Sequence, residues 1–526
     1  MTRLLPLLLL AAGCGSRPHA PRDDTGAEDT ALPDTSPVDS DGDGYAAGED
    51  CDDADPAVHP GAEDASCDGI DQDCDGRDDG CGDLSSAVIW FGQGNLEYAG
   101  WALAGLGDVD GDGFADLLAG APGRAGGPTA HGGAWLVLGG PDPESGGLAE
   151  QALRLEGMRE DERAGWAVGA AGDVNGDGFL DLCVGAPRGS DPRWMAGAVY
   201  LVLGGPEPVA MDLIEADAIW IGVEGHGFVG GAVAGGGDVD GDGLGDVLVG
   251  ARDVDNAVGG EGIVYLVRGR TNPKDRGMNK AITRFKGVVP DGGVGAAVAM
   301  PGDVDGDGLA DMLLGAPGVS AAAEAQGAAY LVLGDAALAT RPLCVADATW
   351  LGLVGDQAGQ AVAGAGDVDG DGRDDLLIGA PGSRGTGAAY LLLGSGAVAD
   401  GDLSAADATF LGDAVADQAG ISVAGAQDVD GDGFADLLVG AATATGVAVL
   451  SGAAYLVPGG PAVTGGVLSD ADVVLQGAGA GEATGWAVAG AGDVDGDGLG
   501  DLLVGAPQAQ CSAGAVYLVL GGSLSW

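Results

Sequence analysis

The chain has 526 residues and a formal net charge of −60 at pH 7, from 81 acidic and 21 basic side chains. This excess argues against a nucleic-acid partner, because such binding needs a positive surface that displaces counterions. The 106 glycines lack the three-residue period of collagen, and no apolar run reaches the roughly 18 residues of a membrane helix. Alanine, valine and leucine are plentiful enough to bury a large core.

Residues 1–13 are interpreted as a signal peptide, because one arginine, a short apolar run and small residues precede Cys14. The segment resembles a bacterial lipoprotein signal, which implies cleavage before Cys14 and lipidation of its thiol. The leucine usual three residues before that cysteine is Ala11 here, with Leu10 one place early. Ordinary signal cleavage nearby is therefore the alternative. Residues 14–38, rich in Pro, Asp and Thr, are predicted to form a disordered tether.

Residues 39–81 form a small unit dense in aspartate and cysteine. Two patterns typical of calcium loops supply its candidate ligands, namely Asp39, Asp41, Asp43 and Asp50 in the first, and Asp71, Asp73, Asp75 and Asp79 in the second. Four cysteines, Cys51, Cys67, Cys74 and Cys81, fit two disulfides in an exported chain, with three possible connectivities. A thiolate zinc site is the alternative. The unit resembles the small Asp- and Cys-rich metal-binding repeats of bacterial surface proteins, and we expect it to hold one or two Ca²⁺.

The rest of the chain repeats one motif seven times, first as GDVDGDGFADLLAGAP at residues 107–122. The first aspartates of the seven copies are separated by 65, 65, 65, 64, 61 and 65 residues. Each copy places acids at positions 1, 3, 5 and 9 of a glycine-rich loop and then becomes apolar. A short apolar run bounded by glycine is typical of a buried strand.

The acidic positions of each loop form a candidate calcium site. Ca²⁺ takes six to eight oxygen ligands, and alternating carboxylates reach one centre when glycines let the chain curl sharply. The alternative is an Asp- and Gly-rich turn that holds no ion. The predicted ligands, about seven Ca²⁺ in all, are Asp108, Asp110, Asp112 and Asp116; Asp173, Asn175, Asp177 and Asp181; Asp238, Asp240, Asp242 and Asp246; Asp303, Asp305, Asp307 and Asp311; Asp367, Asp369, Asp371 and Asp375; Asp428, Asp430, Asp432 and Asp436; and Asp493, Asp495, Asp497 and Asp501.

Each repeat has the length and pattern of four short strands, so the seven repeats predict an all-β, seven-bladed propeller over residues 86–526. A bulky residue of the fourth strand follows the first aspartate by 47 residues, as Trp220 follows Asp173. The same count from Asp493 passes the end of the sequence, so the last repeat lacks its fourth strand. A matching residue, Trp90, stands 18 residues before the first loop. We therefore predict that an N-terminal strand completes the last blade and closes the ring.

The repeats resemble the FG-GAP repeats of integrin α-subunit propellers and their bacterial relatives, over about residues 86–526. One departure is that the phenylalanine of "FG" is absent, while the glycine after it is kept. The place of the phenylalanine is taken by Ala99, Ala164, Val229, Val294, Ala358, Ala419 and Thr484. Another is that the family has cation loops in only some blades, whereas all seven qualify here.

Sequence motifs give little support to catalysis, because no G-x-S-x-G elbow, P-loop or zinc-protease pattern occurs. The leading hypothesis is a non-catalytic, calcium-stabilised, monomeric lipoprotein of the outer membrane or cell surface, acting as an adhesion or interaction scaffold. A secreted or periplasmic location is the alternative. An extracellular hydrolase with its site in the propeller channel, and a purely structural envelope component, are the other functional hypotheses.

The family resemblance places a partner-binding face opposite the calcium loops. The loops of that face hold seven of the chain's 18 arginines: Arg124, Arg159, Arg163, Arg188, Arg193, Arg252 and Arg384. Because a guanidinium fork suits acidic groups, we expect Arg188, Arg193 and the neighbouring Trp194 to contact a protein or an acidic polysaccharide of the cell envelope. Local pairing with acids such as Glu160, Asp161, Asp191 and Asp253 is the alternative.

Overall fold

The computed structural model describes Leu84 and residues 87–524, apart from gaps at 95, 124–130, 160, 190–194, 224–226, 255–258, 281–282, 321–324, 447 and 472. The predicted signal peptide, tether and Asp/Cys-rich unit, with Cys14 and all their candidate ligands, lie outside the described residues. No helix in the described part of the chain is long and apolar enough to cross a membrane.

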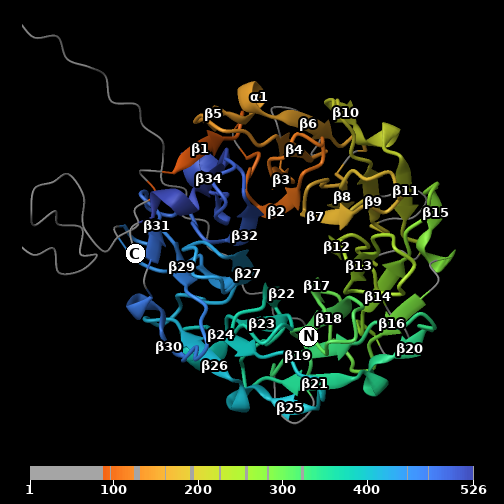
Figure 1. Ribbon diagram of the computed structural model, residues 1–526, viewed down its shortest axis with the longest axis vertical. Coiled ribbons are helices and arrows are strands. Elements are labelled where there is room, and N and C mark those ends of the chain that lie inside the picture. The colour runs from red at the N-terminus through yellow and green to blue at the C-terminus, as the bar shows by residue number, and fades with distance from the viewer. Residues whose placement is uncertain are drawn as a thin grey trace, which may run out of the picture. The chain divides into compact units, whose positions relative to one another are not determined.

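Seven antiparallel sheets are arranged as the blades of a ring (Figure 1). Blade 1 contains β2 (Ala102–Gly107), β3 (Asp116–Ala121), β4 (Gly133–Val137) and β6 (Leu153–Glu156). Blade 2 contains β7 (Ala167–Gly172), β8 (Asp181–Ala186), β9 (Ala198–Val202) and β11 (Ala218–Ile221). Blade 3 contains β12 (Ala232–Gly235), β13 (Val247–Ala251), β14 (Ile263–Val267) and β16 (Thr283–Lys286). Blade 4 contains β17 (Ala297–Gly302), β18 (Asp311–Ala316), β19 (Ala328–Val332) and β21 (Ala348–Leu351).

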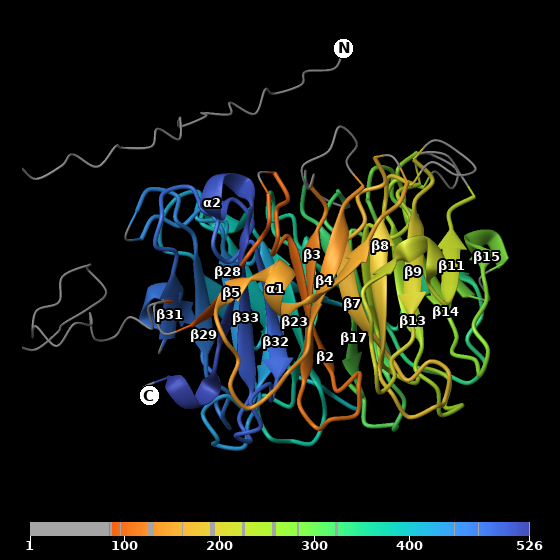
Figure 2. The same cartoon turned by 90° about the horizontal axis from the view of Figure 1, so that it is seen from above.

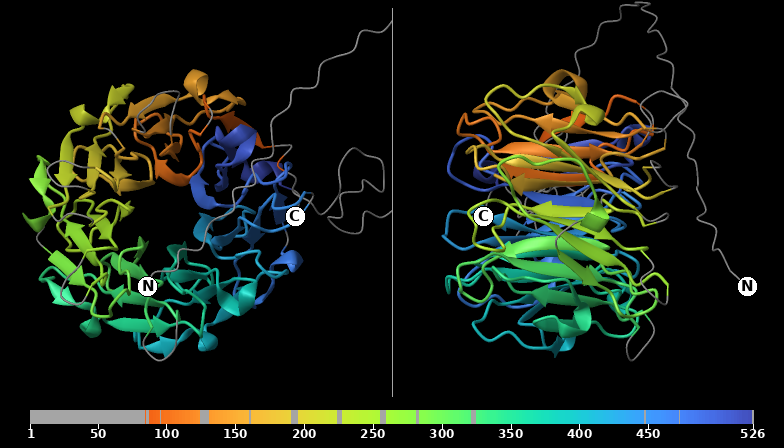
Figure 3. Two further views of the ribbon diagram at one scale, coloured as in Figure 1. Left: turned by 180° about the vertical axis from the view of Figure 1, so that it is seen from behind. Right: turned by 90° about the vertical axis from the view of Figure 1, so that its right-hand side faces the viewer.

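Blade 5 contains β22 (Ala361–Gly366), β23 (Asp375–Ala380), β24 (Ala388–Leu392) and β26 (Ala408–Leu411). Blade 6 contains β27 (Ser422–Gln427), β28 (Asp436–Ala441), β29 (Ala453–Val457) and β31 (Val473–Gln476). Blade 7 contains β32 (Ala487–Gly492), β33 (Asp501–Ala506), β34 (Ala515–Val519) and β1 (Val88–Phe91). The all-β, seven-bladed propeller predicted from the repeats is therefore confirmed, and the two views of Figure 3 show the same ring from behind and from the side.

The ring is closed by the N-terminal strand, as predicted. β1 pairs antiparallel with β34, and Trp90 stands opposite Val516 in that register. The Trp90 side chain is only 2% exposed, and its indole Nε1 donates a hydrogen bond to the carbonyl oxygen of Glu144 at 2.9 Å. The first and last parts of the propeller thus share one sheet, so the last blade has no unpaired edge at β34.

Six of the sheets have a short fifth strand that the sequence pattern did not predict. These strands are β5 (Gly146–Gly147), β10 (Met211–Asp212), β15 (Arg276–Gly277), β20 (Arg341–Pro342), β25 (Gly401–Asp402) and β30 (Gly466–Val467). Each comes from the next blade along the chain and pairs in parallel with the fourth strand of its neighbour, as β10 pairs with β6. A two-residue strand is too short to leave an alternating pattern, yet it covers the outer edge of six of the seven blades.

Short helical segments lie in the connections between strands and after the last strand. They are α1 (Leu148–Gln151), α2 (Ala509–Ser512) and the 3₁₀ turns η1 (Leu213–Glu215), η2 (Met278–Lys280), η3 (Leu343–Val345), η4 (Ser383–Gly385), η5 (Leu403–Ala405), η6 (Leu468–Asp470) and η7 (Gly521–Ser523). Several place one leucine in the core, such as Leu213 and Leu403, both fully buried.

Facing glycines set how closely neighbouring blades approach. Gly165 has φ +79°, and a Cβ there would lie 1.9 Å from the carbonyl oxygen of Gly133 in blade 1. A Cβ on Gly120, in the GAP segment of blade 1, would in turn lie 2.2 Å from the carbonyl oxygen of Gly165. Any side chain at either position would push the two blades apart. The retained glycine of each repeat therefore serves the joint between blades.

Truncating Trp90 tests the closure. We expect Trp90→Ala to lower the free energy of unfolding by about 3–5 kcal/mol, because the side chain is fully buried. The loss should appear first as faster amide hydrogen exchange in β34, the strand that β1 covers. Trp350→Ala is the matched control, because Trp350 has the same place in blade 4. If exchange in β34 rises equally in both variants, the closing role of β1 is wrong.

Candidate metal centres

The acidic loops join the first and second strands of every blade, at the opposite end of the strands from α2 (Figure 2). Within a loop, the first aspartate organises the curl. The carboxylate of Asp108 accepts hydrogen bonds from the backbone N–H of Gly111 at 2.5 Å and of Gly113 at 2.9 Å. Both glycines have positive φ, of +82° and +99°. The same pair of bonds recurs in all seven loops.

The aspartate at position 9 ties the loop to the blade. Asp116 is fully buried, and its two carboxylate oxygens accept hydrogen bonds from Val109 N–H, within the loop, and from Gly139 N–H, beyond the third strand, both at 2.8 Å. The equivalent residues in the other six loops are also fully buried and make the same two bonds. Each such carboxylate therefore joins the loop to the end of the third strand.

Burial also changes the acidity of these groups. It raises the pKa of Asp116, Asp311, Asp375, Asp436 and Asp501 from the ordinary 3.8 to about 6, and the pKa of Asp181 and Asp246 to about 7. The backbone N–H donors oppose this shift, while the other acids of the loop add to it. A bound divalent cation would favour the ionised form instead.

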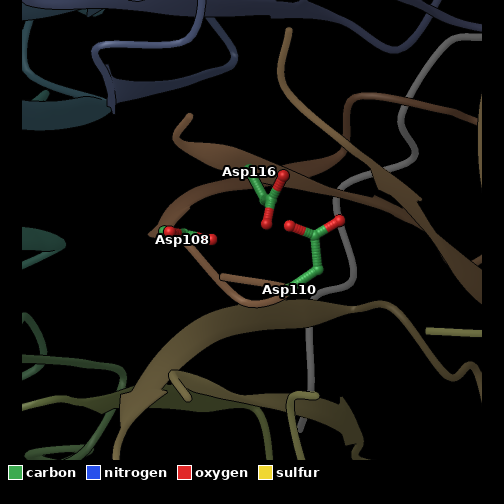
Figure 4. A group of neighbouring side chains, drawn as sticks. All are labelled: Asp108, Asp110 and Asp116. Carbon is green, nitrogen blue, oxygen red and sulfur yellow. The ribbon is translucent and has the colours of Figure 1, made fainter. Parts of the chain in front are cut away.

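Three of the four predicted ligands converge in at least five of the seven loops. Figure 4 shows Asp108, Asp110 and Asp116 pointing toward one another, and ligand oxygens of these three residues lie within 4.8 Å of one another. Equally tight groups form at Asp238, Asp240 and Asp246; at Asp303, Asp305 and Asp311; at Asp367, Asp369 and Asp371; and at Asp428, Asp430 and Asp436. A donor set of several hard carboxylate oxygens around one point fits Ca²⁺. That an ion is held by these residues stays a prediction.

The second loop is the variant with an amide. Asn175 donates from its Nδ2 to Asp177 at 2.8 Å, and its Oδ1 accepts from the Asp177 N–H at 2.7 Å. The amide oxygen remains an acceptable Ca²⁺ ligand, although the loop has one charge fewer.

Arg268 makes a contact with the third loop that the loop motif alone did not reveal. Its guanidinium forms a salt bridge with Asp240 at position 3 of the third loop, and both side chains are largely buried. Thirty residues after their first aspartates, blades 1, 2 and 4 carry Leu138, Leu203 and Leu333 at the equivalent place. The substitution for leucine is visible in the sequence, but its contact with the loop depends on how strand 3 ends. In the fifth loop Arg373 pairs with Asp371 at 2.9 Å, at a more exposed position.

The residues predicted to bind a partner are only partly described. Arg188 lines a cavity on the opposite face together with Arg252, whereas Arg193 and Trp194 lie outside the described residues. Arg252 approaches Asp253 at 3.8 Å, with both side chains about half exposed, which is a weak pair of the kind that local pairing predicted.

Six segments of the chain match the FG-GAP repeat model: residues 99–137, 164–202, 294–332, 358–392, 419–457 and 484–519. The chain contains FG-GAP repeats. The third repeat is not among the matched segments, although it forms a complete blade. Its first strand, β12, is shorter than the others, and Arg268 follows its third strand. Residues 50–80, outside the described part, match a metal-binding motif named for MopE.

Curated relatives include integrin α chains. Integrin alpha-5 of Xenopus laevis is 32% identical over 187 residues, which are 34% of this chain and 17% of that protein. Integrin alpha-PS2 of Drosophila melanogaster is 38% identical over 169 residues, or 30% and 12% of the two chains. Phosphatidylinositol-glycan-specific phospholipase D of Rattus norvegicus is 34% identical over 161 residues, or 30% and 18%. The aligned regions thus cover less than a fifth of each relative.

Removing calcium should destabilise the propeller. At a tenfold excess of calcium over Kd, each occupied loop adds about 1.4 kcal/mol to the free energy of unfolding, so seven independent loops add about 10 kcal/mol. We expect chelation to lower the melting temperature markedly, and Ca²⁺ to restore it better than Mg²⁺, which demands a rigid octahedron. Calorimetric melting with each ion checks this. An unchanged melting curve in the presence of chelator would contradict the prediction.

The raised pKa values predict opposite pH responses with and without metal. The folded, metal-free protein holds protons on the position-9 aspartates up to pH 6 or 7, whereas the unfolded chain releases them near pH 4. Metal-free stability should therefore fall as pH rises from 4 to 7. Calcium keeps these groups ionised, so its affinity should weaken as pH falls below about 6. Melting at pH 5 and pH 8 in both states measures this; a metal-free protein equally stable at both would contradict it.

Replacing Arg268 isolates its effect on the third loop. Arg268→Leu restores the side chain of the other blades and frees Asp240, so we expect tighter or additional calcium binding in a calorimetric titration. Arg270→Leu, at an exposed position two residues away, is the control for a simple change in net charge. Calcium binding that is the same in both variants would show that Arg268 does not compete for the site.

Proposed function

We propose that this protein is a non-catalytic, calcium-stabilised scaffold that binds a partner at the cell surface. The proposal rests on the way the acidic residues are arranged in the structure. In the loops that the structure describes, carboxylates converge in repeated clusters at one end of the blades, each bonded to backbone N–H groups that hold the sheet together. Such clusters serve the fold, and they leave the opposite face of the ring free for recognition. The similarity to integrin α chains supports the same function.

An extracellular hydrolase is the second candidate, and one specific observation favours it. A relative named phosphatidylinositol-glycan-specific phospholipase D is 34% identical to part of this chain. The aligned region is 18% of that enzyme, so the similarity does not assign its activity here. Hydrolysis of a panel of glycans and phosphoesters by the purified protein would replace the scaffold proposal with this one.

The proposed location depends on Cys14. A lipid on this thiol would hold the propeller at the outer membrane or cell surface through the tether of residues 14–38; secretion or periplasmic release follows if the signal is an ordinary one. Mass spectrometry of the mature N-terminus decides between these. Cys14→Ser should move the protein from the membrane fraction into the soluble exported fraction.

The proposed partner surface is the face opposite the acidic loops, and the proposed partner is an envelope protein or acidic polysaccharide. The test is capture from the organism's own envelope by the purified protein. The triple variant Arg188→Ala, Arg193→Ala and Trp194→Ala should lose capture while keeping its calcium-dependent melting. Arg373→Ala, on the acidic-loop face, is the matched control and should capture normally. Undiminished capture by the triple variant would place the partner elsewhere.

A further inference from the structure

A cavity of about 270 Å³ lies where the central channel opens on the face opposite the acidic loops. Its position follows from its lining, because each of the seven blades contributes the residue directly after its retained glycine. A cavity touched equally by all seven blades lies on the axis of the ring. Its volume is slightly below the roughly 300–1,000 Å³ of typical ligand sites, so it suits one small ring rather than an extended ligand.

Three of those seven residues are tryptophans from consecutive blades. Trp101 lies between Trp166 and Trp486, with ring centroids 4.9 Å and 4.8 Å away and interplanar angles of 48° and 45°. All three side chains are only partly buried. In blades 3 and 4 the same position carries Gly231 and Ala296, so the aromatic surface covers one side of the opening and leaves space on the other.

The charge of this cavity is opposite to that of the chain. Arg188 and Arg252 line it and no acidic residue does, among the described residues, in a protein with 81 acids and 21 basic residues. Arg163 lies beside them, with its guanidinium 6.0 Å from the centre of the Trp166 ring. Burial lowers the pKa of Arg163, and the positive charge of Arg188 lowers it further, while Asp161 opposes the shift.

A buried glutamate holds the turn before Trp166, and another holds the turn before Trp101. The carboxylate of Glu162, itself fully buried, accepts hydrogen bonds from Met158 N–H at 2.7 Å, Arg159 N–H at 3.0 Å and the Tyr200 hydroxyl at 2.6 Å. It thereby fixes the turn from which Arg163 and Trp166 project. The corresponding Glu97 accepts from Gln93 N–H at 2.6 Å and from Trp135 Nε1 at 3.2 Å, and fixes the turn before Trp101. These two turns of the site are therefore preorganised, which reduces the entropic cost of binding.

We propose that this cavity binds one carboxylate-bearing sugar ring of an acidic polysaccharide. The flat apolar faces of the tryptophans match the C–H face of a pyranose, and the arginine forks match its carboxylate. An aromatic surface of this kind also attracts cations, but the arginines around it repel them. The nearby acids, Asp161 and Asp253, flank Arg163 and Arg252 at the rim rather than line the cavity. The inference rests on the proposed binding function and names its ligand class.

The experiment is a calorimetric titration of the calcium-loaded protein with a trigalacturonic acid oligosaccharide, and with the same oligosaccharide fully methyl-esterified. We expect the acid to bind and the ester to bind at least tenfold more weakly, because the arginines lose their anionic partner. Trp166→Ala and Arg252→Ala should each weaken binding of the acid at least tenfold. Trp350→Phe and Arg341→Ala, outside the cavity, are the matched controls and should bind as the unaltered protein does.

The possible outcomes separate this inference from the function beneath it. Binding of the acid that is equal in Trp166→Ala and in the controls would overturn the cavity as the site. Equal binding of acid and ester would overturn the role of the arginines. If neither oligosaccharide binds while envelope capture still depends on the loops of this face, the scaffold function stands and the sugar site is wrong. If capture fails as well, the proposed function itself is wrong.

Discussion

The fully buried aspartate at position 9 of each loop is the constraint on which the propeller depends. Asp116 and its six equivalents place a carboxylate inside the protein, bonded to backbone N–H groups of the loop and of the segment after the third strand. Other carboxylates converge on the same point, so the arrangement is electrostatically unfavourable until a cation balances it. Burial is the main cause that raises the pKa of the buried group, and the neighbouring carboxylates add to it. We therefore expect folding and calcium binding to be coupled in the blades.

This constraint divides the molecule into two faces. One end of the blades is committed to holding the sheets together through the acidic loops. Between the blades, the close approach at Gly120 and Gly165 leaves no room for side chains, so the joints are rigid. The other end carries the connections from the second to the third strand of each blade and from the fourth strand to the next blade, and its central opening gathers tryptophans and arginines. The structural chemistry and the proposed recognition chemistry thus occupy opposite ends of the same strands.

Much of the fold could be predicted from the sequence because its elements are repeated. The seven acidic loops, the strand pattern and the place of Trp90 follow from counting residues, since each repeat must satisfy the same packing. The features that sequence analysis missed are too short to show an alternating pattern, occur once, or depend on convergence. The fifth strands are only two residues long, and the contact of Arg268 with Asp240 occurs in one blade. Trp101 and Trp166 meet where neighbouring blades pack, and Trp486 joins them only when the ring closes. The third repeat shows that a segment can fold as a blade without matching the repeat model.

The central claim is that calcium in the loops is a part of the fold, and the calcium content of the protein tests it most directly. The propeller, residues 84–526, is purified in calcium, dialysed against buffer with trace calcium, and measured by plasma mass spectrometry against protein concentration. The account predicts about six to seven calcium ions per chain, with the third loop the first to lose its ion because Arg268 competes there. A folded propeller that retains none, with an unchanged sheet signal in circular dichroism, would contradict it.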